Sequence, residues 1–349
     1  MVRSFFTILC LSFCLKPAHG QGLGQINDTQ DKSPIIIDAE ESVVCDETAR
    51  KCTATGLAKT QKGTSIVYGD ILTVHFTEKR DPTAMTAQGN VRIETPRETA
   101  YGDYAHYDVG LDRVRMTGEN LRLVSPNQTL TAKDSVEYWH GKKQGIARGN
   151  ARLEIQEKNE SIQADELIAH FCLSQENDQK MEIEKAEATG HVLASSPTGT
   201  VTGDRGIYYA KEKRIDMFGN ALVEIPEKKE LIQADKIIAY FEPSKDGSKK
   251  MEIEKVDAVG NVLASSPDGI VTGNRGVYYP KIEFVEMFED VKITQGDNII
   301  QGQYGRANLK TNLIEIFPYI PKGDSCSPHQ RISGMIMPTN AKKLKKPCP

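Results

Sequence analysis

Acidic side chains that recur along the chain are the first candidates for chemistry, because paired carboxylates can act as general acid and base. In this chain of 349 residues, the recurring aspartates are Asp103, Asp134, Asp165, Asp204 and Asp235. They stand at the same point of successive sequence units. A carboxylate at a fixed point of every unit is typical of a turn, where aspartate bonds nearby backbone. We therefore interpret these aspartates as structural.

Histidine is the next candidate, as a base or a metal ligand. His170 aligns with Tyr240 and His191 with Asn261 when the repeat described below is superposed, so the second copy lacks both histidines. The sequence contains no His-x-x-x-His pair, nucleophile elbow, phosphate-binding loop or dinucleotide fingerprint. We expect no catalytic residue, no metal site and no cofactor.

Seven cysteines are present, and Cys10 and Cys14 lie in the N-terminal apolar segment. No pair has a Cys-x-x-Cys or zinc-type spacing. Cys45 and Cys52 flank the charged stretch DETARK, so they face each other if the flanking arms form a hairpin, and a disulfide there is as plausible as two free thiols. Cys326 and Cys348 would close a loop near the C-terminus, and Cys172 is expected to be a lone packed thiol.

The N-terminus has the layout of a secretory signal. Arg3 precedes an apolar run from Ser4 to Leu15, and the small-residue pair Ala18 and Gly20 predicts cleavage after residue 20. The run is shorter than the roughly 20 residues of a membrane span; an uncleaved anchor is the alternative. Without residues 1–20 the chain has 42 basic and 48 acidic residues, a net charge of −6. This acidic balance argues against a nucleic-acid partner.

A tandem duplication organises the rest of the chain. Residues 149–171 and 219–241 share 15 of 23 residues, and residues 181–209 and 251–279 share 21 of 29, both at an offset of 70. Smaller units of 29–41 residues recur about eight times between roughly residues 33 and 316. Repeats of this length stack on one another, because one unit alone cannot bury its apolar face.

Each unit has the pattern of β-strands that are buried on one face. In GNVRIET, Val91 and Ile93 point one way while Arg92 and Glu94 point the other. Gly-Asn steps such as Gly89-Asn90 precede these strands and are interpreted as turns. No helical stripe occurs beyond the signal. Residues 317–349 are rich in Pro, Ser, Gly and Lys and are predicted to be a flexible, mostly disordered tail.

These units resemble the OstA/LptA family of lipopolysaccharide-transport proteins. The resemblance covers about residues 33–316 and is carried most closely by residues 85–108, 116–139 and 147–155, MTAQGNVRIETPRETAYGDYAHYD, MTGENLRLVSPNQTLTAKDSVEYW and ARGNARLEI. It implies an all-β fold, a repetitive antiparallel β-jellyroll of two sheets that form an open shell. With the signal 1–20 and the tail 317–349 read from the residues, the resemblance assigns a first jellyroll half to 33–148 and a second half to 149–316, after a linker at 21–32.

The resemblance also implies a function. We expect a periplasmic protein that is not an enzyme and that holds the acyl chains of lipopolysaccharide between its sheets. Partners would be an LptC-like protein of the inner membrane, an LptD-like protein of the outer membrane, and further copies added end to end. The N-terminal edge would be residues 35–44 and the C-terminal edge would lie within 296–317. The apolar residues expected to line the groove are Val91, Ile93, Leu121, Leu123, Leu153, Ile155, Val223, Ile225, Val291 and Ile293.

Other readings remain open from the sequence. The same apolar residues suit the plain core of a β-sandwich. The whole chain suits a structural β-solenoid, such as a surface repeat protein without lipid affinity. A polysaccharide-acting enzyme on a β-helix would need a charged cluster in one unit only, and none is found. A chain whose signal stays uncut would instead suit an LptC-like role.

Overall fold

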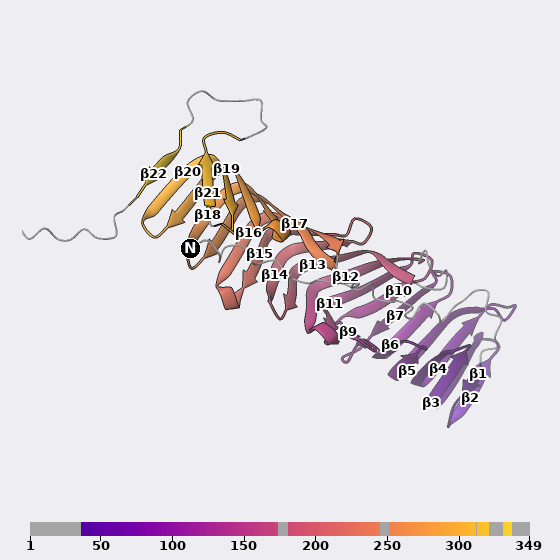
Figure 1. Ribbon diagram of the computed structural model, residues 1–349. Helices are drawn as coiled ribbons and strands as arrows, with labels where there is room; N and C mark the ends of the chain where they lie inside the picture. The colour runs from indigo at the N-terminus through magenta and orange to yellow at the C-terminus, as the bar shows by residue number, and fades with distance from the viewer. Residues whose placement is uncertain (1–35, 174–180, 245–250, 312, 321–330, 337–349) are drawn as a thin grey trace, which may run out of the picture. The chain divides into compact units, whose positions relative to one another are not determined.

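A computed structural model describes residues 36–173, 181–244, 251–311, 313–320 and 331–336 (Figure 1). The predicted signal 1–20, the linker 21–32, Cys326 and Cys348 lie outside these ranges. The described residues form two compact units. The first comprises residues up to 197 together with 202–215, and the second comprises 198–201 together with residues from 216 onward.

The first unit is built almost entirely of strands. Its elements are β1 Ile36–Asp38, β2 Ser42–Asp46, β3 Lys51–Lys62, β4 Ser65–Phe76, β5 Pro82–Glu94, β6 Thr99–Asp108, β7 Arg113–Thr117, β8 Arg122–Ser125, β9 Gln128–Thr131, β10 Ser135–Trp139, β11 Gln144–Ile155, the 3-10 turn η2 Gln156–Lys158, β12 Glu160–Leu173 and β13 Met181–Ser196. β14 Gly199–Tyr209 and β15 Arg214–Ile225 fall at the division between the units. The predicted boundary at 148/149 lies within β11 and stays a prediction.

The second unit repeats the same kind of element. It contains η3 Pro226–Lys228, β16 Glu230–Pro243, β17 Met251–Ser266, β18 Gly269–Tyr279, η4 Pro280–Ile282, β19 Phe284–Gln295, β20 Asn298–Asn308, β21 Leu313–Phe317 and β22 Ser333–Met335. The described residues contain no α-helix, and therefore no helix with the length and hydrophobicity of a transmembrane span.

All pairings within the units are antiparallel between neighbours. In the first unit β3, β4, β5 and β6 lie side by side (Figure 1), β6 continues to both β7 and β8, and these lead through β10 and β9 to β11, β12 and β13. In the second unit β16 to β20 pair in order, and β20 pairs with β21 and β22. The predicted all-β antiparallel fold is confirmed.

The strands are longer than expected, because the Gly-Asn steps are bulges and not turns. Gly89 and Asn90 lie inside β5, where the register against β4 and β6 shifts. Both residues have positive φ, 71° and 46°. A bulge of this kind adds a residue to one strand and bends it. Each bulged strand therefore continues on both sides of the bend, and the two predicted facing layers are two halves of the same strands.

One strand lies in the segment that was predicted to be tail. β22 pairs with residues 299–301 of β20, while β21 pairs with residues 304–308. On the side of β20 that faces away from β19, β21 therefore pairs with one half of the strand and β22 pairs with the other half. The free edge at this end belongs to β21 and β22, and not to β20.

Candidate functional site

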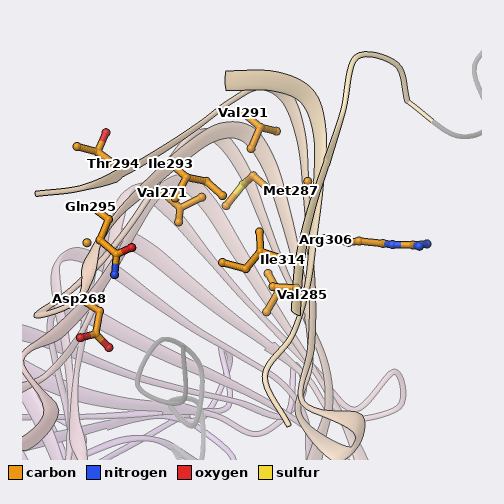
Figure 2. A pocket seen from close by; sticks show the side chains of 13 residues that line it. Asp268, Val271, Val285, Met287, Val291, Ile293, Thr294, Gln295, Arg306 and Ile314 are labelled. Atoms are coloured by element: carbon orange, nitrogen blue, oxygen red, sulfur yellow. The ribbon is translucent and has the colours of Figure 1, made fainter. Parts of the chain in front are cut away.

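An apolar pocket lies under the last strands of the second unit. Figure 2 shows the strands arching over it, with Val271, Val285 and Met287 among the side chains that point inward. The pocket is partly open to solvent, and the space in it and at its mouth, open solvent included, is about 640 Å³. It is lined by Asp268, Gly269, Val271, Val285, Met287, Val291, Ile293, Thr294, Gln295, Gly305, Arg306, Ala307 and Ile314. The polar residues stay at its margin, where Arg306 points away from the space (Figure 2).

Alternation along the strands produces this pocket. In β19, Val285, Met287, Val291 and Ile293 line the pocket, and even numbers of residues separate them, as on one face of a strand of period two. The register against β20 shifts between Phe288 and Val291, so a bulge lies between the two pairs. The local sequence therefore sets an inner face that is apolar over the whole strand.

A smaller space of about 220 Å³ lies near the start of the first unit. Its lining is also largely apolar and consists of Ile37, Val43, Cys52, Ala54, Thr60, Leu72 and Val74. These residues come from β1, β2, β3 and β4. The first strands of the chain thus leave open space beside the core, as the last strands do.

Between β3 and β11 the interior of the first unit is a packed core. One contiguous hydrophobic cluster includes Val91, Ile93, Val114, Met116 and Leu121, each at most 3% exposed. A side chain buried to this degree is already in contact with protein atoms on all sides. An acyl chain can reach these residues only if the layers of the unit separate.

The predicted lining residues fall into two groups. Val91, Ile93, Leu121, Val223, Ile225 and Val291 are buried, and Leu123, Leu153, Ile155 and Ile293 are half-buried. Val291 and Ile293 line the pocket of the second unit, and Leu123 packs against the cluster of the first. The structure places all ten away from full exposure, and lipid contact by any of them stays a prediction.

The outward side chains are mostly charged and paired. Arg148 bonds Glu137 at 3.0 Å and Glu166 at 2.7 Å across three strands. Lys185 and Arg205 both contact Glu187, and these hydrogen bonds lower the pKa of the Glu187 carboxyl. Such ladders suit a solvated outer face and leave the apolar chemistry to the inside.

The recurring aspartates support the bulges of the neighbouring strand. Asn90 donates to both carboxylate oxygens of Asp70 at 3.2 and 3.0 Å, and Asn261 donates to Asp235 at 2.9 Å. A Cβ at Gly89 or Gly260 would overlap these carboxylates. Asp235 thus accepts a hydrogen bond from the adjacent strand, whereas the sequence predicted a bond to its own backbone. A structural role for the other predicted aspartates stays a prediction.

A second recurring acidic position was missed in the sequence. Glu98, Glu160 and Glu230 each stand five residues before one of the aspartates, at Asp103, Asp165 and Asp235. Burial raises the pKa of Glu98 and of Glu230 to about 7, and it also raises the pKa of Glu160. The constant spacing of five residues was the signal that could have revealed them.

The strands at the two ends carry exposed apolar side chains. At the N-terminal end β1 and β2 both pair with β3, and Ile36, Val43 and Val44 are half exposed or more. Cys45 and Cys52 form a disulfide between β2 and β3. At the C-terminal end Leu313 and Ile314 of β21 are exposed. No further strand pairs with these end strands in the part of the chain that the structure describes.

Metal-ligating side chains do not gather anywhere in the described ranges. Cys172 is a half-buried free thiol. His191 is exposed, and its Nδ1 lies 2.8 Å from Oδ2 of Asp165, so it occupies the place of Asn90 and Asn261 beside a bulge. This placement gives His191 a structural partner.

The chain matches the model of one family of known proteins. The family described as "LptA/(LptD N-terminal domain) LPS transport protein" matches three overlapping stretches, residues 37–143, 134–245 and 223–313. A solved structure with similarity is LptH of Pseudomonas aeruginosa, described as the LptA homologous periplasmic component of the conserved lipopolysaccharide transport device. It is 15% identical, with a TM-score of 0.23, over 52% of this chain and 97% of LptH. No curated protein shows significant similarity to the chain.

Proposed function

The chain belongs to the LptA and LptD N-terminal domain family of lipopolysaccharide-transport proteins, and from this premise we propose that it is a periplasmic carrier of lipopolysaccharide. It binds the acyl chains on the inner face of its strands and leaves the sugars in water. It acts without catalysis and without a cofactor. The jellyroll halves at 33–148 and 149–316 are the units that carry this function.

The pocket of the second unit is the observation that carries the proposal. Its inward lining is apolar, with Val271 on β18 and Val285, Met287, Val291 and Ile293 on the adjacent strand β19. Transfer of each methylene group from water into such a site contributes about 0.8 kcal/mol. Six buried methylenes would thus supply about 5 kcal/mol before the entropic losses of binding are subtracted.

The ends of the chain support the bridging part of the proposal. β2 and β21 present exposed apolar side chains on short end strands. Strand addition at such edges joins chains through main-chain hydrogen bonds. We propose that LptC-like and LptD-like partners, and further copies of this chain, bind there. Export through a cleaved signal at residues 1–20 would deliver the protein to the periplasm.

Photo-crosslinking tests the binding site. A photoreactive amino acid at Ile293, which lines the pocket and is half-buried, should capture lipopolysaccharide in cells. The matched control is Lys292, an exposed residue that directly precedes Ile293 in β19. Crosslinking from Ile293 at more than about ten times the level from Lys292 supports the groove. Equal crosslinking from both positions contradicts it.

The packed cluster of the first unit favours one alternative, a structural β-solenoid without lipid affinity. That alternative predicts no crosslink from any inward position. Probes at Ile155 and Leu153, which are half-buried in β11, extend the test to the first unit, with Arg152 as the outward control.

A further inference from the structure

Four copies of the repeat hold a polar side chain at the same inward position. Ser65, Glu98, Glu160 and Glu230 stand five residues before Asp70, Asp103, Asp165 and Asp235. We call these four the inner polar row. Ser65, Glu160 and Glu230 are the first residues of β4, β12 and β16, and Glu98 directly precedes β6. Each member of the row therefore stands at the N-terminal end of its strand, where the apolar inner face of that strand begins.

Side-chain alternation shows that the row faces inward. In β16, Glu230 is followed at intervals of two by Ile232 and Ala234, and all three are buried. In β12, Glu160 has the same relation to the buried Ala164. Side chains two residues apart lie on one face of a strand. Glu230 is 2% exposed and Glu160 is 5% exposed.

These buried groups are unsatisfied. Neither carboxyl oxygen of Glu230 has a hydrogen-bond partner among the described residues. The same holds there for Oε2 of Glu98, Oε2 of Glu160 and Oγ of Ser65. Buried polar atoms in folded proteins nearly always have a partner, because leaving them without one is unfavourable. Glu160 has one charged neighbour, because Nζ of Lys158 lies 4.0 Å from its Oε2, which is longer than a hydrogen bond. Four buried polar groups without a hydrogen-bond partner at one point of the repeat support the inference that a bound molecule supplies the partner.

The surroundings of the row favour the uncharged acid. Burial raises the pKa of Glu230 to about 7, Lys228 opposes this, and Asp268 adds to it. Burial also raises the pKa of Glu98 to about 7 against the effect of Arg97. A protonated carboxyl both donates and accepts a hydrogen bond. The row therefore suits an uncharged polar group that has both kinds of atom, and it does not suit a phosphate or a metal ion.

Glu230 is the member of the row that lies near the proposed binding space. The charge of Asp268 raises the pKa of Glu230. Asp268 and Gly269 both line the pocket of the second unit. Glu230 is thus close to the margin where the apolar lining ends. An amphiphile whose chains fill the pocket must place its linkage groups at such a margin.

We propose that the inner polar row is a hydrogen-bonding subsite for the ester, amide and hydroxyl groups that join acyl chains to the polar part of the amphiphile. This inference rests on the proposed lipid-binding function. The apolar lining holds the chains, and the row fixes how deep they enter. The ligand class is an acylated amphiphile with carbonyl or hydroxyl groups near the start of its chains.

Paired variants and paired probes test the subsite. Glu160→Met and Glu230→Met remove the hydrogen bonds and keep the size, whereas Glu160→Gln and Glu230→Gln keep an uncharged donor and acceptor. The probes are purified lipid A and a pyrenyl alkane that has no ester, amide or hydroxyl group. Glu254→Met is the matched control, because Glu254 is exposed on β17.

We expect each Met variant to weaken lipid A binding about three- to tenfold, the effect of one or two hydrogen bonds. Binding of the pyrenyl alkane should stay within about twofold. The Gln variants should bind lipid A as the wild type does. The affinity of the wild type for lipid A should also fall between pH 6 and pH 8.5, as Glu98 and Glu230 ionise. The charged and titratable neighbours of the row are Lys158, Lys228, Arg97, Asp268 and Tyr138. The Glu160→Gln, Glu230→Gln double variant should lose the part of the fall that these two residues contribute and keep the part that Glu98 contributes.

The outcomes separate the two claims. If the wild type and the Met variants bind lipid A equally, the subsite is wrong and the lipid-binding function stands. If the wild type binds neither probe, the function fails and the subsite fails with it. Thermal unfolding of each variant at pH 6 shows whether it is folded, and the Gln variants, which differ least in shape, carry the pH test if a Met variant does not fold.

Discussion

Single buried carboxyl groups determine how the stability of this protein varies with pH. Glu230 has a pKa of about 7 when folded, against about 4.5 for an ordinary glutamate. Between these values the folded state keeps a proton that the unfolded state has lost. The free energy of unfolding therefore falls as pH rises from about 4.5 to about 7, by up to about 1.4 kcal/mol per pH unit for this group.

Replacing Glu230 with Gln should remove this slope. Chemical denaturation at pH 5, 6, 7 and 8 should show that the variant gains stability relative to the wild type as pH rises, by about 1–3 kcal/mol over the range. Glu254→Gln, on the exposed face of β17, is the control and should follow the wild type. Parallel curves for the wild type and Glu230→Gln would contradict the burial of this carboxyl.

The bulge at Gly89 depends on a residue without a side chain. Gly89 has a φ of 71°, and a Cβ there would overlap the Asp70 carboxylate. Gly89→Ala should lower the free energy of unfolding by about 1–3 kcal/mol. Gly141→Ala is the control, because a Cβ at Gly141 meets no atom within 4 Å, and it should be nearly neutral.

A double-mutant cycle identifies the cause. Asp70→Ala alone loses the hydrogen bonds from Asn90, but it also removes the atoms that the new methyl group would meet. The double variant should therefore lose less stability than the two single variants together, by about 0.5 kcal/mol or more. Additive losses would show that φ alone accounts for the need for glycine.

Individual residues differ in how far the sequence predicts them. Val91 and Ile93 alternate with Arg92 and Glu94, so their inward direction follows from period two alone. Glu230 escaped prediction because a glutamate at the start of a strand is ordinarily solvated. Its raised pKa comes from burial and from the charge of Asp268, which lies in the turn between β17 and β18 and is distant from Glu230 in the sequence.

At the scale of elements, the sequence predicts strands well and their lengths poorly. The Gly-Asn step has positive φ both in a hairpin turn and in a bulge, so the pattern at Gly89-Asn90 suits either. Only pairing with both neighbours distinguishes them, because β5 continues in register with β4 and β6 beyond the step. β22 was missed because Ser333–Met335 has no strand pattern, and its pairing with β20 is a tertiary contact.

The end strand β2 depends on its disulfide. Its residues are all exposed and it pairs only with β3 in the described structure, so few apolar contacts hold it. A disulfide that closes a loop of about eight residues contributes roughly 2.5 kcal/mol by restricting the unfolded chain. The disulfide between Cys45 and Cys52 thus supplies most of the local stability of this edge.

Substituting both cysteines, Cys45→Ser with Cys52→Ser, should release β2 without unfolding the unit. Hydrogen exchange measured by mass spectrometry should become faster in residues 42–46, while β5 and β6 keep their protection. Cys172→Ser is the control, because Cys172 is the free thiol of the described residues. Unchanged exchange in β2 would show that pairing alone holds this edge.

At the scale of the whole molecule, the proposed association of copies would take place through the two end strands. Val44 of β2 is 61% exposed and Leu313 of β21 is 55% exposed. If the N-terminal edge of one chain binds the C-terminal edge of the next, the contact is heterologous, and it forms open chains of any length. A contact between two identical edges would instead stop at a dimer.

Lysine at either edge distinguishes these arrangements, because a charge that must be buried opposes strand addition. Val44→Lys and Leu313→Lys should each remove self-association, seen by light scattering as a mass that no longer rises with concentration. An equimolar mixture of the two should form dimers and nothing larger, since each variant keeps one intact edge and the two intact edges are complementary. Leu111→Lys, at an exposed position between β6 and β7, should associate as the wild type does. If either single variant forms dimers, identical edges pair with each other. If the wild type stays monomeric at all concentrations, the proposal of end-to-end assembly is wrong.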